Sequence, residues 1–303
     1  MSGWMEYFIR FGLYTALTMC FGGSFFLSTY FEEIKGSQYG LSIKKIFPFF
    51  CVLAFIFSAL QIVFLTEAME DVSLSEVSLK GILFLMQQGS YDILFTLRFV
   101  ALLAVLFLSV RKPPSKMNWL ACTYLSGIAL MTEAWFGHAV SDDVGMGWLH
   151  LVADVAHILT AGVWGGSLLA FCWLLFGSKE AVISEKVLRK FSCIGYAVVT
   201  ILLMTGVVNT YFIVGSDLKD YTHPSSYVVL IYTKIIVFVA MLLLASFNHF
   251  VFTPRLGQRL RDNVSAVKAV QRLRMSIVLE YTLYLVIIGL VAVVGVQSPT
   301  PDM

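Results

Sequence analysis

The chain has 303 residues, of which 58% are hydrophobic and only 13% are charged, and its formal net charge at pH 7 is +2. With a mean hydropathy of +0.82, this composition excludes an ordinary soluble domain and predicts an integral membrane protein. The small net charge gives no reason to expect a nucleic-acid partner.

Several apolar stretches are long enough to cross the hydrocarbon core of a bilayer as helices. Eight of them lie near residues 7–30, 46–66, 92–110, 119–138, 149–176, 191–214, 227–252 and 276–297. The stretch at 119–138 is the weakest, because Thr132 and Glu133 interrupt it. The sequence therefore predicts an all-α bundle of eight transmembrane helices, which forms one membrane domain over residues 1–303.

Lysine and arginine are concentrated in alternate connections between these predicted helices. Sixteen of the 21 basic residues lie in the connections near 31–45, 111–118, 177–190 and 253–275. Positively charged connections stay in the cytoplasm during insertion. We therefore expect these four loops to be cytoplasmic and both termini to lie outside.

Four ionisable side chains fall within twenty residues of one another: His138, His150, Asp154 and His157. The last three are spaced i, i+4, i+7, which places them on one face of a helix, with the two histidines about 10 Å apart along its axis. A short glycine-rich loop that contains Met146 allows His138 to fold back towards His150. Ionisable groups within a bilayer mark ion paths, cofactors or proton relays.

The residue types in this cluster favour copper as the ligand. Imidazole and thioether suit soft or borderline metals, so His138, His150, His157 and Met146 fit copper better than magnesium or calcium. Asp154 can orient an imidazole or accept a proton that the metal displaces. One alternative is a structural cluster of packed, hydrogen-bonded side chains.

A second alternative is a b-type cytochrome, in which the histidines ligate haem iron and Arg98 or Lys234 holds the propionates. Arg10, Arg98 and Lys234 all fall in the outer parts of their predicted spans. These cations either reach the outer headgroups or pair with Asp154 or Glu133.

Further polar or sulfur-containing residues within the spans predict a path inward from the histidines. The candidates are Met131, Met204, Asn209, Lys234, Met275 and Glu280. Glu280 is expected about one turn from the cytoplasmic end of the last span, where we expect it to pair with Arg274. The small-residue stretch at 161–166 predicts that the histidine-bearing helix packs closely against a neighbour.

These residues resemble the copper resistance protein D family (CopD), which consists of bacterial inner-membrane proteins with eight helices. The motifs that carry the resemblance are Gly137-His138-Ala139, the block from His150 to Gly166, Phe191-Ser192, Thr205 to Asn209, Lys234, Asn248, Thr253 to Leu256, and Leu279-Glu280. The resemblance is strongest over residues 90–297.

The resemblance implies copper handling at the bacterial inner membrane, with the histidines as ligands and a periplasmic copper-binding protein of the CopC kind as partner. We expect a copper transporter or binding protein in copper homeostasis and resistance rather than an enzyme. Import, export and a non-transporting relay to a copper enzyme all remain open. The sequence has no phosphate-binding loop of the G-x-x-x-x-G-K type, which excludes transport driven by ATP hydrolysis in this chain.

Overall fold

The computed structural model describes residues 3–111, 115–136, 147–176, 181–214, 226–262 and 264–296, and all regular structure in these ranges is helical. The helices in chain order are α1 (Gly3–Thr29), α2 (Phe31–Ile34), α3 (Gln38–Glu70), η1 (Leu74–Glu76), α4 (Leu79–Met86), α5 (Tyr91–Val110), α6 (Lys116–Met131), η2 (Thr132–Phe136), α7 (Gly147–Phe176), α8 (Ala181–Val214), α9 (Ser226–Phe247), η6 (Asn248–Phe252), α10 (Thr253–Arg261) and α11 (Val267–Val294).

Within the described ranges, seven helical stretches are long and apolar enough to cross a membrane: α1, α3, α5, α7, α8, α11, and the stretch from Tyr227 to Arg261 that joins α9, η6 and α10. The chain is therefore built as a multi-pass membrane protein. The remaining predicted span, at 119–138, corresponds to α6 and η2. It is not among the seven, because the α-helix ends at Met131 and tightens into a 3₁₀ turn that contains Thr132 and Glu133.

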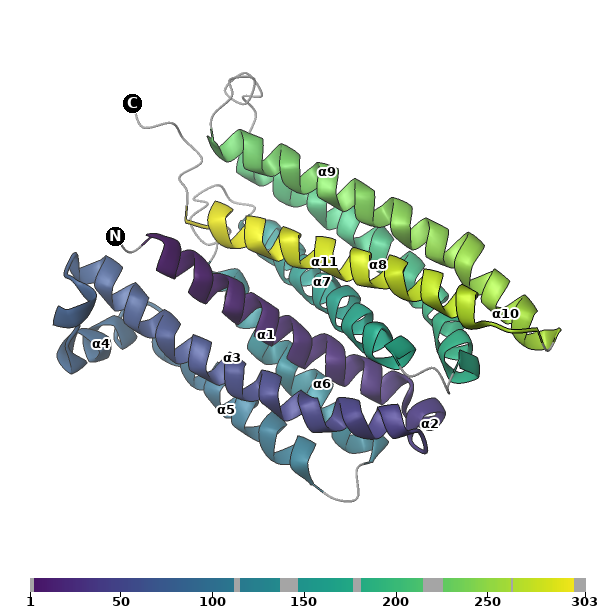
Figure 1. Cartoon of the computed structure of the whole chain (residues 1–303). Coiled ribbons are helices and arrows are strands. Elements are labelled where there is room, and N and C mark those ends of the chain that lie inside the picture. The colour runs from purple at the N-terminus through teal and green to yellow at the C-terminus, as the bar shows by residue number, and fades with distance from the viewer. Residues whose placement is uncertain are drawn as a thin grey trace.

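The long helices run alternately in opposite directions along one bundle (Figure 1). The beginnings of α1 and α7 and the end of α11 lie at one end, which we call the histidine end. The short helices α2 and α10 lie at the opposite end, which we call the basic end. The distribution of lysine and arginine predicts that the histidine end lies on the outer side of the membrane.

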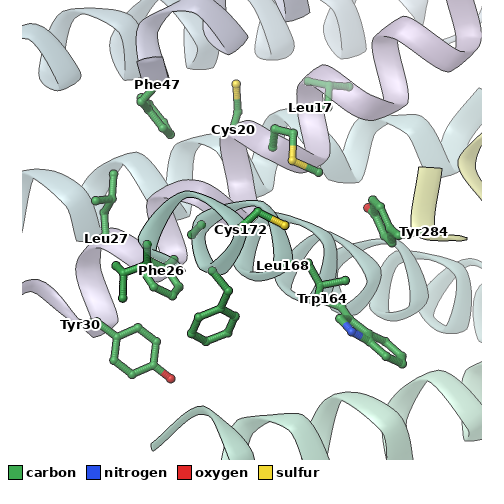
Figure 2. Close-up of a cluster of buried hydrophobic side chains, with 14 of the residues drawn as sticks. Leu17, Cys20, Phe26, Leu27, Tyr30, Phe47, Trp164, Leu168, Cys172 and Tyr284 are labelled. Atoms are coloured by element: carbon green, nitrogen blue, oxygen red, sulfur yellow. The ribbon is translucent and has the colours of Figure 1, made fainter. Parts of the chain in front are cut away.

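Helix α1 is the central helix of the bundle, since it packs against α3, α6, α7 and α11. Leu17, Cys20 and Phe26 of α1 and Leu168 and Cys172 of α7 belong to the cluster of buried side chains between them (Figure 2).

The contact between α1 and α7 is closest at their glycines. A Cβ atom built at Gly22 would lie 2.0 Å from the carbonyl oxygen of Gly162, and one built at Gly166 would lie 2.4 Å from the backbone of Gly22. The predicted close packing of the small-residue stretch is confirmed.

The last helix is longer than the sequence predicted. Helix α11 begins at Val267 rather than near residue 276, because Val270 and Leu273 are apolar at helical spacing and are buried in the bundle. This earlier start places Glu280 near the middle of α11 instead of one turn from its end.

Candidate functional site

The first turns of α7 present the predicted site residues towards α8. His150 is 3% exposed, and its ring stacks on Phe212 with 4.9 Å between ring centroids and an interplanar angle of 6°. Asp154 and His157, one and two turns further along α7, are half-buried. The three residues follow one stripe of a continuous helix, as their spacing predicts.

Thr205 of α8 holds the ring of His157 in one orientation. The Nδ1 atom of His157 lies 2.8 Å from Thr205 Oγ1, and that hydroxyl donates its own proton to the carbonyl oxygen of Ile201 at 2.7 Å. A hydroxyl has a single proton, so Thr205 accepts from Nδ1–H of His157. In the neutral imidazole the other nitrogen, Nε2, is then unprotonated and can bind a metal ion.

Asp154 is oriented by the next turn of α8. Asn209, four residues after Thr205, donates from Nδ2 to Asp154 Oδ1 at 3.2 Å. Lys234 of α9 and His150 lie close enough to Asp154 to interact electrostatically. Asp154 is therefore bonded to α8 and lies within electrostatic range of a cation on α9.

Thr205 was not among the predicted site residues, although it opens the motif that ends at Asn209. The signal was the four-residue interval between Thr205 and Asn209, which places both side chains on one face of α8. From that interval one could infer that a second helix faces the histidines. The interval does not indicate which atom Thr205 contacts.

The other predicted residues differ in where the structure places them. His138 and Met146 lie outside the described residues. Met131 is half-buried on α6, whereas the side chains of Met204 and Met275 are 66% and 68% exposed on the surface of the bundle. Among the described residues, no group of three His, Cys, Asp or Glu side chains is arranged to hold a metal ion.

Glu280 lies deep in the bundle between three helical segments. Its Oε1 accepts a hydrogen bond from Trp164 Nε1 of α7, and its Oε2 accepts one from Asn248 Nδ2 of η6, both at 2.8 Å. The expected pairing with Arg274 is wrong. Arg274 instead donates to the carbonyl oxygen of Leu175 at 3.0 Å. Arg274 and Glu280 both lie on the continuous α11, where a spacing of six places their side chains about 9 Å apart along the axis and on different faces.

A separate buried ion pair lies between α5 and η2. Arg98 Nη1 is 2.7 Å from Glu133 Oε1, and both side chains are almost fully buried. Arg98 also donates to Gln61 Oε1 at 2.6 Å and to Thr132 Oγ1 at 2.7 Å. Of the two alternatives for Arg98, pairing with Glu133 is the one that the structure shows.

The haem alternative needs two axial ligands that face each other across a gap. The described histidines do not form such a pair, since His150 and His157 lie on one helix. His249, in η6, bonds instead to Ser192 and Tyr196 of α8 at 2.8 and 2.9 Å.

The fold and these buried polar groups together define a multi-pass helical membrane protein that keeps ionisable side chains inside its bundle. Residues 185–294 match the family described as Copper resistance protein D, and residues 1–151 match Copper resistance protein D-like, N-terminal domain. The chain is 30% identical over 300 residues to Copper resistance protein D of Pseudomonas syringae pv. tomato, with 96% of each chain covered.

The chain therefore belongs to the copper resistance protein D family. The matched residues include the first ninety, where the motifs of the sequence analysis were absent. No solved structure matches the chain.

Proposed function

We propose that this protein serves copper resistance and homeostasis by moving copper ions across the bacterial inner membrane, with the histidines of α7 as ligands. The observation that carries the proposal is the hydrogen bond from His157 Nδ1 to Thr205, which leaves Nε2 as a metal-binding atom. The family match supports copper as the ion.

We assign His150 and His157 to two successive positions of the ion. The two residues are seven apart on α7, about 10 Å along the axis, whereas two nitrogen ligands of one ion lie within about 4 Å of each other. His138 and Met146 complete the outer position with His150. Asp154 lies between the two positions and attracts the cation to the stripe.

In this proposal copper arrives at the histidine end from a periplasmic binding protein of the CopC kind. It then moves past Asn209 and Lys234 towards the middle of the bundle, where Glu280 lies. The outward-facing Met204 and Met275 are not part of this interior route.

The ligand assignment is tested by the metal content of purified protein from cells grown with added copper. We expect copper near stoichiometry in the wild type, and loss of most of it in a His150→Ala, His157→Ala double variant. His249→Ala is the matched control, because this histidine bonds to α8 near the basic end and is expected to leave copper content unchanged. Iron in place of copper would favour the haem alternative, and copper retained by the double variant would contradict the ligand assignment.

Uptake into sealed proteoliposomes separates transport from a relay. A transporter accumulates copper inside the vesicles, and His157→Ala lowers the initial rate at least tenfold. A relay to a copper enzyme binds copper at the same residues but leaves the vesicle interior free of it.

A further inference from the structure

The molecule contains a second buried acidic group that the histidine site does not use. Glu280 is 3% exposed and lies near the middle of α11. Its two carboxylate oxygens accept one hydrogen bond each, from the indole of Trp164 and the amide of Asn248, and both donors are neutral. None of the ion pairs among the described residues includes Glu280.

The surroundings of Glu280 supply no bonded cation. Several titratable or charged groups lie on α11 and on the segments packed against it. They are Glu6, Tyr7, Arg10, Tyr14 and Cys20 of α1, His150, Asp154, His157 and Cys172 of α7, Tyr227, Tyr232 and Lys234 of α9, His249 of η6, Arg255, Arg259 and Arg261 of α10, and Lys268, Arg272, Arg274, Tyr281 and Tyr284 of α11. Two of these groups have other partners in the described structure. Arg274 donates to Leu175, and His249 bonds to Ser192.

Two opposite effects act on the charge of this carboxyl group. Burial opposes a free negative charge, whereas the two N–H donors stabilise one. A carboxyl group subject to both effects can exist in the ionised and in the protonated form. This distinguishes Glu280 from Glu133, whose charge is fixed by contact with Arg98.

Asn248 can form a hydrogen bond with Glu280 in both its ionised and its neutral form. Its Nδ2 donates to the carboxylate, while its Oδ1 is buried and has no hydrogen-bond partner among the described residues. After rotation of the amide, Oδ1 can accept the proton of a neutral carboxyl group. Asn248 also opens the π-helical turn η6, a distortion that is frequent at functional sites.

The position of Glu280 relates it to the proposed copper site. Trp164 follows His157 by seven residues, so it lies on the same stripe of α7 and about 10 Å deeper. Protonation of Glu280 removes a negative charge that attracts a cation at His157 across about this distance, so binding of the proton and binding of the cation oppose each other. At an effective dielectric constant near 20, this opposition changes the affinity of His157 for copper, and that of Glu280 for the proton, on the order of tenfold.

We propose that Glu280 is the proton-binding site of a copper–proton exchange, an inference that rests on the proposed transport of copper. Copper at His157 favours release of the proton from the carboxyl group, and departure of copper favours its return. In the protein, the O–H bond of the carboxyl group breaks and re-forms while coordination of copper by His157 forms and breaks. A proton is taken from the water at the basic end and released to the water at the histidine end, and no electron is transferred.

The test uses the full-length protein in proteoliposomes with a pH-sensitive dye trapped inside and copper added at the histidine end. Wild-type protein is expected to make the interior more alkaline as copper enters. Glu280→Gln keeps an oxygen that accepts from Trp164 but cannot carry the proton. This variant is expected to keep the copper site with an affinity lowered on the order of tenfold, and to lose the copper-dependent pH change, with at least tenfold slower uptake. Glu32→Gln, an exposed carboxylate at the basic end, is the matched control and should behave as the wild type.

The outcomes separate this inference from the proposed function. Absence of copper uptake by the wild type contradicts transport. Copper uptake without a pH change, or a pH change that persists in Glu280→Gln, contradicts the role of Glu280 while leaving transport intact.

A second measurement does not depend on transport or on the folding of Glu280→Gln. Infrared difference spectra of the wild type, recorded on addition of copper, should show loss of a protonated carboxyl band. Trp164→Phe removes one donor to Glu280 and should shift that band, whereas Trp173→Phe, on the same helix, should not. A spectrum without a carboxyl change on copper binding would overturn the proposal.

Discussion

Buried ionisable groups have different bonding partners in the two halves of the bundle. Between α3, α5 and η2, the guanidinium of Arg98 is in direct contact with Glu133 and bonds to Gln61 and Thr132. Among α7, α8, α9 and α11, the carboxylates of Asp154 and Glu280 instead accept from the neutral amides of Asn209 and Asn248.

In the proposed function, this difference separates a structural site from a functional one. A carboxylate in contact with an arginine has its charge compensated permanently, and it can neither bind a cation nor exchange a proton without breaking the pair. A carboxylate or imidazole held by neutral partners keeps its orientation while it remains available to an ion. The α7 half therefore contains the groups that a passing cation can use.

Breaking the ion pair is expected to have the largest effect on stability. Arg98→Met leaves Glu133 buried without its cation, which costs about 3–5 kcal/mol. Thermal or denaturant unfolding in detergent should show this loss as a sharply lower midpoint and a poor yield of folded protein.

The double variant Arg98→Met, Glu133→Gln is the control for the ion pair. Because it removes both charges, it should recover most of the lost stability. If the single and double variants were equally unstable, Arg98 would contribute through packing on Phe95 and Phe136 rather than through the ion pair.

The sequence predicted the helical class and the α7 stripe well, because both depend on local spacing. Hydropathy located the long helices, and a period of 3.6 placed His150 and His157 on one face. Contacts between helices are not local, so the partners of His157 and Glu280 had to come from the structure.

The misplacement of Glu280 has a specific cause. Residues 253–275, which include Lys268 and Arg272, were assigned to a connection between spans, whereas Val270 and Leu273 continue the helix there and are buried. Basic side chains on the outer face of a helix do not end it.

An alanine at Gly22 is expected to have the next largest effect. Its Cβ would lie 2.0 Å from the carbonyl oxygen of Gly162, a backbone atom that cannot rotate away. Separation of α1 from α7 should lower stability by about 1–3 kcal/mol and weaken copper binding through the displaced histidines.

The neighbouring glycine gives the matched control for this prediction. A Cβ at Gly23 meets only the ring of Phe47, at 3.5 Å, so Gly23→Ala should be tolerated in the same unfolding assay. Equal losses for the two variants would mean that glycine flexibility, rather than the close helix contact, matters on α1.

Removal of the hydroxyl that orients His157 should affect copper more than stability. Thr205→Val keeps the shape of the side chain but removes the acceptor for Nδ1–H, which should weaken copper binding about 10- to 100-fold. Isothermal titration with copper would measure the change, and Thr205→Ser should restore binding.

Thr210→Val is the control on the same helix. Thr210 makes the same type of bond to its own backbone, at 2.7 Å to the carbonyl oxygen of Gly206, but it is exposed. If Thr210→Val lowered copper affinity as much as Thr205→Val, a general loosening of α8 would explain both.

The smallest effect is expected at the basic end, where Glu33 of α2 pairs with Lys190 of α8. The hydrogen bond from Lys190 lowers the pKa of Glu33 below its ordinary value. A lowered folded-state pKa contributes stability above the pKa of the unfolded chain, and that stability is lost as the pH falls through the folded-state value. Glu33→Gln should therefore cost about 1 kcal/mol or less at neutral pH, and the difference from wild type should shrink on acidification. The unfolding midpoints of the wild type and Glu33→Gln, recorded from neutral to acid pH, measure this difference in stability. A difference that stayed constant down to acid pH would show that Glu33 acts through packing rather than through its charge.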